Sequence, residues 1–86
     1  MSTVIKALPD RELGHIVQTN DDLYYYVDST NTFDAGYETM VFMCEKDADE
    51  FKTSDWRDLY VEHYSSWDKM EKRHNYLIKH LEEVLK

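Results

Sequence analysis

The stretch from Gly36 to Glu45, GYETMVFMCE, is the densest apolar run in the chain and limits its fold most strongly. Successive side chains of a strand point to opposite faces of a sheet, and here both alternating sets are largely apolar. The two sets are Tyr37, Thr39, Val41 and Met43, and Glu38, Met40, Phe42 and Cys44. A strand that is apolar on both sides is covered on much of both faces. The sequence therefore predicts a central strand over residues 37–44.

Three more segments have the pattern of strands. Residues 22–28 alternate between two sets of side chains: Leu23, Tyr25 and Val27 against Tyr24, Tyr26 and Asp28. Residues 14–19 are expected to form a hairpin with this strand, and residues 58–63 a fourth strand. Residues 45–55, EKDADEFKTSD, are expected to be a polar loop. Glu38 is then interpreted as a carboxylate at the rim of the sheet rather than a catalytic group.

Near Ser65 the apolar period changes from two residues to 3.6, the period of a helix. Apolar and aromatic side chains recur on one helical face: Trp67, Met70, His74, Leu77, Ile78, Leu81, Val84 and Leu85. Ser65 and Asp68 have the spacing of a capping box, with Ser66 as the other candidate N-cap. Such a helix, from about 66 to 85, needs a surface to cover. We therefore expect an α+β fold, a small antiparallel sheet of three or four strands with one long C-terminal helix packed on it.

The length and the cysteine content restrict the domain count and the compartment. A chain of 86 residues is expected to form a single domain, 1–86. Cys44 is the only cysteine, so no internal disulfide can form and a reducing cytoplasm is the expected setting. No run of eighteen apolar residues and no basic segment before an apolar one is present, so neither a membrane span nor a signal peptide is predicted.

The net charge of −8 is unevenly distributed along the chain. Residues 1–65 carry fourteen acidic and five basic side chains, whereas residues 66–86 carry four and five. The acidic side chains of the first part cluster at Asp21 and Asp22, along 45–50, and at Asp55, Asp58 and Glu62. A negative field of this kind repels phosphate and anionic lipid. Direct binding to nucleic acid or to a membrane is therefore not expected, and a basic protein surface is the favoured partner.

The histidines do not have the spacing of a metal site. His74 and His80 are six residues apart, which separates them by about 120° around a helix. His63 could meet His74 across a sheet–helix contact, but no cysteine pair accompanies them. The segments 28–39 and 47–58 lack the glycine and the final glutamate of a calcium loop. We expect no metal and no other cofactor, and we interpret His74 as a core histidine bonded to backbone groups or to a tyrosine hydroxyl.

No recognisable catalytic motif is present. Cys44 ends a buried type of strand, and nothing near it in the sequence would lower its pKa, so we interpret it as a structural thiol. Glycine-rich phosphate loops, nucleophile elbows and paired-carboxylate motifs are absent. The protein is therefore not expected to be an enzyme.

One part of the chain is similar to a known group of proteins. The run YETMVF at residues 37–42 is followed by Asp55–Trp56, by Leu59–Tyr60 and by a helix that carries His74. This arrangement resembles a group of small uncharacterised proteins encoded in bacteriophages and prophages, over residues 36 to about 80. The resemblance implies a phage or prophage origin. It assigns no activity to the chain and no role to any residue.

Aromatic residues are more numerous than one small core requires, with seven tyrosines and two tryptophans. The strands at 22–28 and 37–44 have more apolar surface than one helix can cover. Either the N-terminal segment 2–9, STVIKALP, folds over the second face, or that face meets a partner. Tyrosine and tryptophan are the residues that dominate protein–protein interfaces.

These observations predict a non-catalytic protein that acts by binding another protein in the host cytoplasm. The favoured hypothesis is an inhibitor of a host nucleic-acid enzyme, of the anti-CRISPR or anti-restriction type, whose acidic side chains imitate phosphates in a basic channel. The expected contact residues are Asp47, Asp49, Glu50, Asp55 and Asp58, with Trp56 as an anchor among them. The alternative is a structural or assembly component of a phage particle that acts as a homo-oligomer. A third interpretation is that the acidic residues serve solubility alone.

Overall fold

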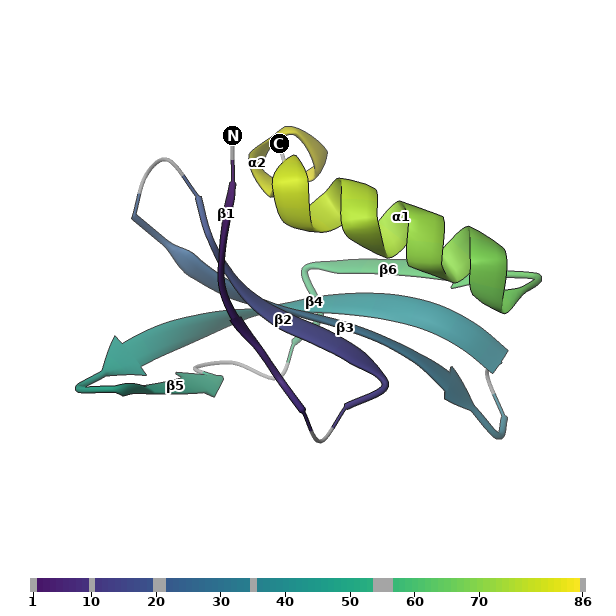
Figure 1. The fold of residues 1–86 in the computed structure, drawn as a ribbon, viewed down its shortest axis with the longest axis horizontal. Helices are drawn as coiled ribbons and strands as arrows, with labels where there is room; N and C mark the ends of the chain where they lie inside the picture. The colour runs from purple at the N-terminus through teal and green to yellow at the C-terminus, as the bar shows by residue number, and fades with distance from the viewer. Residues whose placement is uncertain (1, 10, 20–21, 35, 54–56, 86) are drawn as a thin grey trace.

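The computed structural model describes residues 2–9, 11–19, 22–34, 36–53 and 57–85 of the chain. This part folds into one antiparallel sheet with helices on one of its faces (Figure 1). In chain order the elements are β1 (Thr3–Ala7), β2 (Leu13–Gln18), β3 (Tyr24–Thr32), β4 (Gly36–Asp47), β5 (Glu50–Thr53), β6 (Tyr60–Tyr64), α1 (Trp67–Lys79) and α2 (Leu81–Val84).

The sheet is organised around β4. The strands β1 to β5 lie side by side in chain order, and β6 also pairs with β4. On the side away from β3, β6 pairs with Tyr37–Val41 and β5 with Cys44–Asp47. Two strands therefore share one edge of β4, and β3 lies along its other edge.

The expectation of three or four strands is wrong, because six strands are found among the described residues. The four expected strands correspond to β2, β3, β4 and β6, while β1 and β5 were not predicted. The β1 strand has only exposed side chains, so its sequence shows no alternation of buried and exposed positions. Its register with β2 also shifts between Val4 and Lys6. The β5 strand is short and polar, and the expected loop at 45–55 is instead a hairpin formed with the end of β4.

The expectation of one long C-terminal helix is also wrong, because α1 has 13 residues and ends at Lys79. Ser66 is its N-cap, with Oγ accepting a hydrogen bond from Lys69 N at 3.3 Å. At the other end, Ser2 N donates to Lys79 O at 3.1 Å, and Ser2 Oγ accepts from Leu81 N at 2.9 Å. Leu81 N is the donor that a continuing helix would use, so this contact from the start of the chain helps to end α1 and begin α2.

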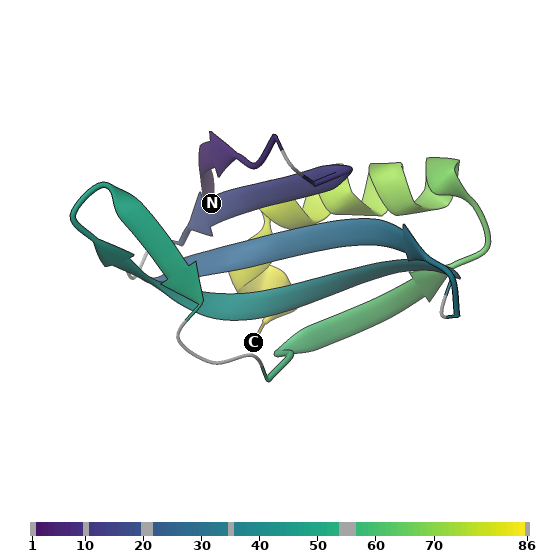
Figure 2. The same cartoon turned by 90° about the horizontal axis from the view of Figure 1, so that it is seen from below.

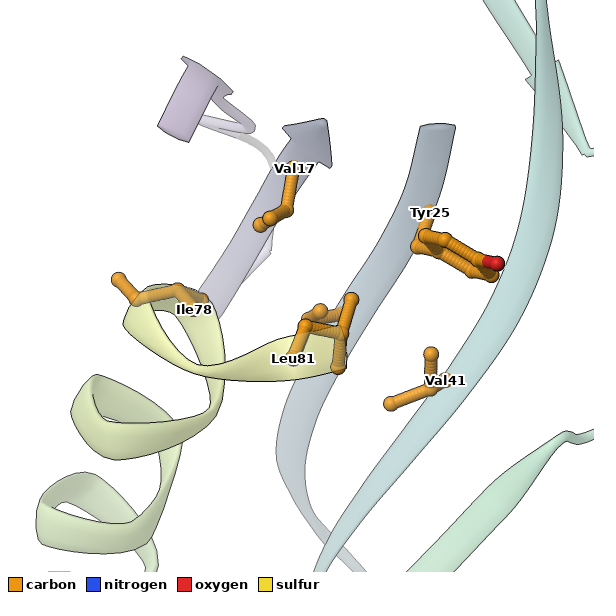
Figure 3. Close-up of a cluster of buried hydrophobic side chains, with 6 residues drawn as sticks. Val17, Tyr25, Val41, Ile78 and Leu81 are labelled. Carbon is orange, nitrogen blue, oxygen red and sulfur yellow. The ribbon is translucent and has the colours of Figure 1, made fainter. Parts of the chain in front are cut away.

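The two faces of the sheet carry two separate apolar clusters. On the helix side the buried residues are Val17, Tyr25, Val27, Val41, Ile78 and Leu81 (Figure 3). On the opposite side they are Ile16, Tyr26, Phe42 and Cys44, with Leu8, Tyr24, Met40 and Phe51 packed against them. Leu8 and Phe51 come from the segments next to β1 and within β5, so the two outer hairpins partly cover the face that α1 leaves open. Both faces of β4 are therefore buried, as expected for a central strand.

Candidate functional site

A continuous chain of polar side chains lies buried between α1 and the sheet. Ser29 Oγ is 2.6 Å from His74 Nδ1, and His74 Nε2 is 2.8 Å from His15 Nδ1. Ser29 Oγ also lies 2.5 Å from Thr39 Oγ1, its cross-strand neighbour, and Tyr64 OH donates to the same Thr39 oxygen at 3.0 Å. We call these five residues the His74 chain. Their mutual hydrogen bonds offset the cost of burying polar groups.

Burial keeps the His74 chain uncharged. Burial, and then the neighbouring His15, lower the pKa of His74 from 6.5 to about 4. Burial also lowers the pKa of His15. A serine hydroxyl next to an imidazole is the pair that nucleophilic catalysis uses, but Ser29 and His74 are both fully buried. A substrate cannot reach the Ser29 oxygen in this arrangement, so the geometry is that of a core network.

The burial of His74 agrees with its interpretation as a core histidine, while the expected bonding partners are wrong. Its ring nitrogens contact Ser29 and His15 rather than backbone groups or a tyrosine hydroxyl. His63 does not meet His74 and instead pairs with Glu38. The register that places His15 and Ser29 beneath α1 could not be read from residue spacing.

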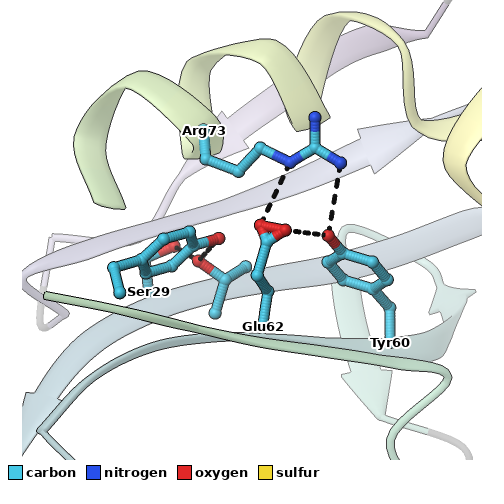
Figure 4. Close-up of polar contacts among 6 residues, drawn as sticks. Ser29, Tyr60, Glu62 and Arg73 are labelled. Atoms are coloured by element: carbon cyan, nitrogen blue, oxygen red, sulfur yellow. Dashed lines mark hydrogen bonds and ion pairs between the residues drawn. The ribbon is translucent and has the colours of Figure 1, made fainter. Parts of the chain in front are cut away.

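A second polar cluster joins β6 to α1 (Figure 4). Arg73 Nε lies 3.2 Å from Glu62 Oε2, and Arg73 Nη2 donates to Tyr60 OH at 3.3 Å. The same hydroxyl donates to Glu62 Oε1 at 2.7 Å. Burial, and then the hydrogen bond to Glu62, raise the pKa of Tyr60, and burial raises the pKa of Tyr64 to about 12. Both phenols are therefore protonated at neutral pH, and the cluster fixes the helix on the sheet.

Glu38, within the central apolar strand, has a partner that sequence spacing did not reveal. It lies opposite His63 in the pairing of β4 with β6, and His63 Nε2 is 3.2 Å from Glu38 Oε2. The side chain of Glu38 is 13% exposed and that of His63 is 57% exposed. The pair lies on the face of the sheet opposite α1. Among the described residues, no group of three or more histidine, cysteine or acidic side chains could hold a metal ion.

Cys44 lies on the second face of the sheet and is buried. Burial raises the pKa of its thiol to about 11. The thiolate is the reactive form of cysteine, so the Cys44 side chain behaves as an apolar core group at neutral pH.

Three of the acidic residues expected to contact a partner lie together at the turn between β4 and β5. Asp47 and Glu50 are directly opposite each other, and Asp49 lies in the turn that joins them. All three are exposed, and Asp47 forms a 3.6 Å ion pair with Lys52 in which both side chains are largely solvated. An exposed pair of this kind contributes little to stability, so it leaves Asp47 free to exchange partners.

The other expected contact residues are not placed in this group. Asp58 is exposed next to Leu59, whose N donates to Val41 O. Val41 is six residues before Asp47 on β4, which corresponds to about 20 Å along an extended strand. Asp55 and Trp56 lie outside the described residues.

Two acidic residues that sequence reasoning did not choose as contacts join the same end of the sheet. Gln18, Tyr24 and Cys44 are aligned across β2, β3 and β4, so β2 ends and β3 begins at the end of the sheet where β4 turns into β5 (Figures 1 and 2). We call this region the acidic end, and its described acidic members are Asp22, Glu45, Asp47, Asp49 and Glu50. All five are exposed, and Lys46 and Lys52 are the basic residues among them.

Comparison with known proteins finds no family model, no curated protein and no solved structure that matches this chain. Within the described residues, none of the helices combines the length and the apolar character needed to cross a membrane.

Proposed function

We propose that this protein is a non-catalytic binding protein whose acidic end docks on a basic surface of a partner protein. The observation that carries the proposal is the grouping of Asp47, Asp49 and Glu50 at one exposed turn. Asp22 and Glu45 add to this group from the neighbouring turn and from β4. Sequence-distant acidic residues at one end of a rigid sheet give a local negative field that can steer a positively charged partner.

The placement of the reactive side chains supports a binding role. Ser29 and His74 are fully buried, and the Cys44 thiol is buried and protonated at neutral pH. These groups hold the core together, and their hydrogen bonds and packing account for their positions. The acidic end, in contrast, contributes little to the core, because all of its acidic side chains are solvated.

The more specific form of the proposal is inhibition of a nucleic-acid enzyme in a host cytoplasm. The channels of such enzymes bind phosphate through lysine and arginine side chains, and carboxylates at an exposed turn can occupy the same cations. The resemblance of residues 36–80 to phage and prophage proteins suggested this partner class. A complex of this kind would weaken steeply as salt concentration rises.

The test compares three immobilised forms of the protein in a host lysate at low salt. The first is the wild type, and the second carries Asp47→Asn, Asp49→Asn and Glu50→Gln, which removes three charges while keeping the side-chain shapes. The control carries Glu12→Gln, Asp34→Asn and Glu71→Gln, which removes three exposed charges away from the acidic end.

We expect the wild type and the control to retain the same basic partner and the first variant to lose it. Added duplex DNA should release the partner if it is a nucleic-acid enzyme, because DNA and the acidic end would compete for one channel. A partner retained equally by all three forms, with the same salt dependence, would show that the acidic end is only a solvated surface.

A second candidate function, assembly into a homo-oligomer, is favoured by the outer strands. Within the described residues, β1 pairs only with β2 and β6 only with β4, so each has an unpaired edge. Exposed apolar side chains lie on or next to these strands: Val4, Ile5, Leu59 and Val61. Unpaired edges with apolar side chains can pair with a second copy of the chain.

A further inference from the structure

The face of the sheet opposite α1 contains a cavity of about 420 Å³. Figure 2, which views the molecule from this side, shows the hairpins that contain β1 and β5 at the borders of the face. The cavity lies between residues of these two hairpins, and its lining includes Leu8, Ile16, Tyr26, Cys44 and Phe51. Its volume falls in the usual range for sites that hold small molecules.

The floor of this cavity is apolar and well ordered by packing. Ile16, Tyr26 and Cys44 come from three adjacent strands, and each is less than a tenth exposed. Phe51 contacts Tyr24 with ring centroids 5.2 Å apart, which fixes one wall. Because the Cys44 thiol is protonated, it adds no charge to the floor. A ligand that fills this space would need a mostly apolar body.

One cation at the cavity, Lys6, forms no ion pair within the described part of the chain. Lys6 is the cross-strand neighbour of Ile16, so its side chain lies on the cavity side of β1, and it contributes to the cavity lining. Lys52 also lines the cavity, but its ammonium group lies 3.6 Å from Asp47, whose negative charge opposes the approach of a second carboxylate. An exposed ammonium group beside an apolar cavity favours a ligand with a single negative group, even in a protein of net charge −8.

We propose that this cavity binds a small apolar carboxylate, with its aliphatic or aromatic body on Ile16, Tyr26 and Phe51 and its carboxylate at Lys6. The inference does not rest on the proposed function of the acidic end, since the cavity lies on the second face of the sheet. The carboxylate would remain at the mouth, where Lys6 is exposed and water can complete its solvation. Burial of the apolar body would supply most of the affinity.

The experiment measures binding of octanoate and 2-naphthoate, each against its neutral amide, by calorimetry and by amide chemical shifts. We expect saturable binding of at least one carboxylate at a single site, with shifts at Ile16, Tyr26 and Cys44. The carboxylate should bind about 1.5- to fivefold more tightly than its amide, the ratio expected for one exposed ion pair. The two bodies distinguish an aliphatic from an aromatic ligand.

Lys6→Met and Thr53→Phe locate the ligand, and Lys52→Met serves as the control. Lys6→Met should remove the preference for the carboxylate and leave amide binding unchanged, whereas Lys52→Met should alter it less. Thr53→Phe, at a partly buried position in the cavity lining, should weaken carboxylate and amide alike. Circular dichroism checks that each variant is folded, and the chemical shifts of the wild type locate the ligand independently of the variants.

The proposal is overturned by any of three results. The first is the absence of saturable binding of both carboxylates at millimolar concentrations. The second is binding whose chemical-shift changes lie away from Ile16, Tyr26 and Cys44. The third is a preference for carboxylate over amide that persists in Lys6→Met, which would assign the charge recognition to another residue.

Discussion

His74 places a titratable ring in the core with no exposure to water. Burial, and then His15, lower its pKa to about 4 from the 6.5 of an unperturbed histidine. The unfolded chain therefore binds the proton more readily than the folded chain does. The stability that depends on neutral His74 is complete above pH 6.5 and is lost as pH falls toward 4. A shift of this size corresponds to roughly 3 kcal/mol, and the lowered pKa of His15 acts in the same direction.

We therefore predict that the free energy of unfolding falls on acidification from about pH 7 to about pH 4.5. Urea unfolding at several pH values measures this slope for the wild type and for His74→Gln. The glutamine can hydrogen-bond to Ser29 but cannot titrate in this range, so the variant should be less stable at neutral pH and should have a shallower slope. An equal slope in the two proteins would mean that the carboxylates alone cause the acid sensitivity.

At the scale of single elements, the strands and the helix that the sequence predicts are those whose apolar residues recur with a regular period. The strands β3 and β4 and the start of α1 have alternating or helical patterns that packing reinforces. The sequence does not predict β1 and β5, because neither has a clear apolar alternation. These segments form strands through their hydrogen bonds to β2 and β4. The end of α1 depends on Ser2, which is close to Leu81 only in the folded chain.

The same limit applies to the candidate site. Asp47, Asp49 and Glu50 are close in sequence, so their grouping could be predicted. Asp22 joins them only through the register of β2, β3 and β4, and Asp58 is separated from them because the chain returns to pair with the other half of β4. The cavity beside Lys6 depends on the unpredicted strands β1 and β5, so no local pattern indicated it.

The packing of α1 on the sheet gives a prediction at this scale. Leu77 is fully buried on the inner face of the helix, while the neighbouring Asn75 is exposed. Leu77→Asp would bury an unpaired carboxylate and lose the leucine contacts, at a combined cost of about 5 kcal/mol or more, which is comparable to the stability of a small domain. We expect this variant to be unfolded by circular dichroism.

Asn75→Asp is the matched control, since it adds the same charge on the exposed face of the same helix. This variant should keep the wild-type spectrum and a melting temperature within a few degrees of the wild type. The milder Leu77→Ala should fold but lose about 2–5 kcal/mol in urea unfolding. If Leu77→Asp were as stable as Asn75→Asp, the inner face of α1 would have been assigned to the wrong residues.

At the scale of the whole molecule, charge and exposed strand edges act in opposite directions. The net charge of −8 makes copies of the chain repel one another, most strongly at low salt. The unpaired edges of β1 and β6 favour association, but β1 has only five residues, an irregular register and an exposed lysine at position 6. Short edges, bulges and edge lysines are the features by which sheets avoid pairing with one another. The balance favours a monomer.

We predict that the protein elutes as a monomer in size-exclusion chromatography with light scattering, at about 50 mM and about 500 mM salt alike, since screening removes the repulsion without creating a suitable edge. A dimer at both salt concentrations would contradict this prediction and favour assembly through apolar strand edges. In that case Ile5→Lys on β1 and Val61→Lys on β6 would show which edge pairs, because each places a charge on one exposed apolar position. Dissociation by only one of the two substitutions would identify the strand through which the copies pair.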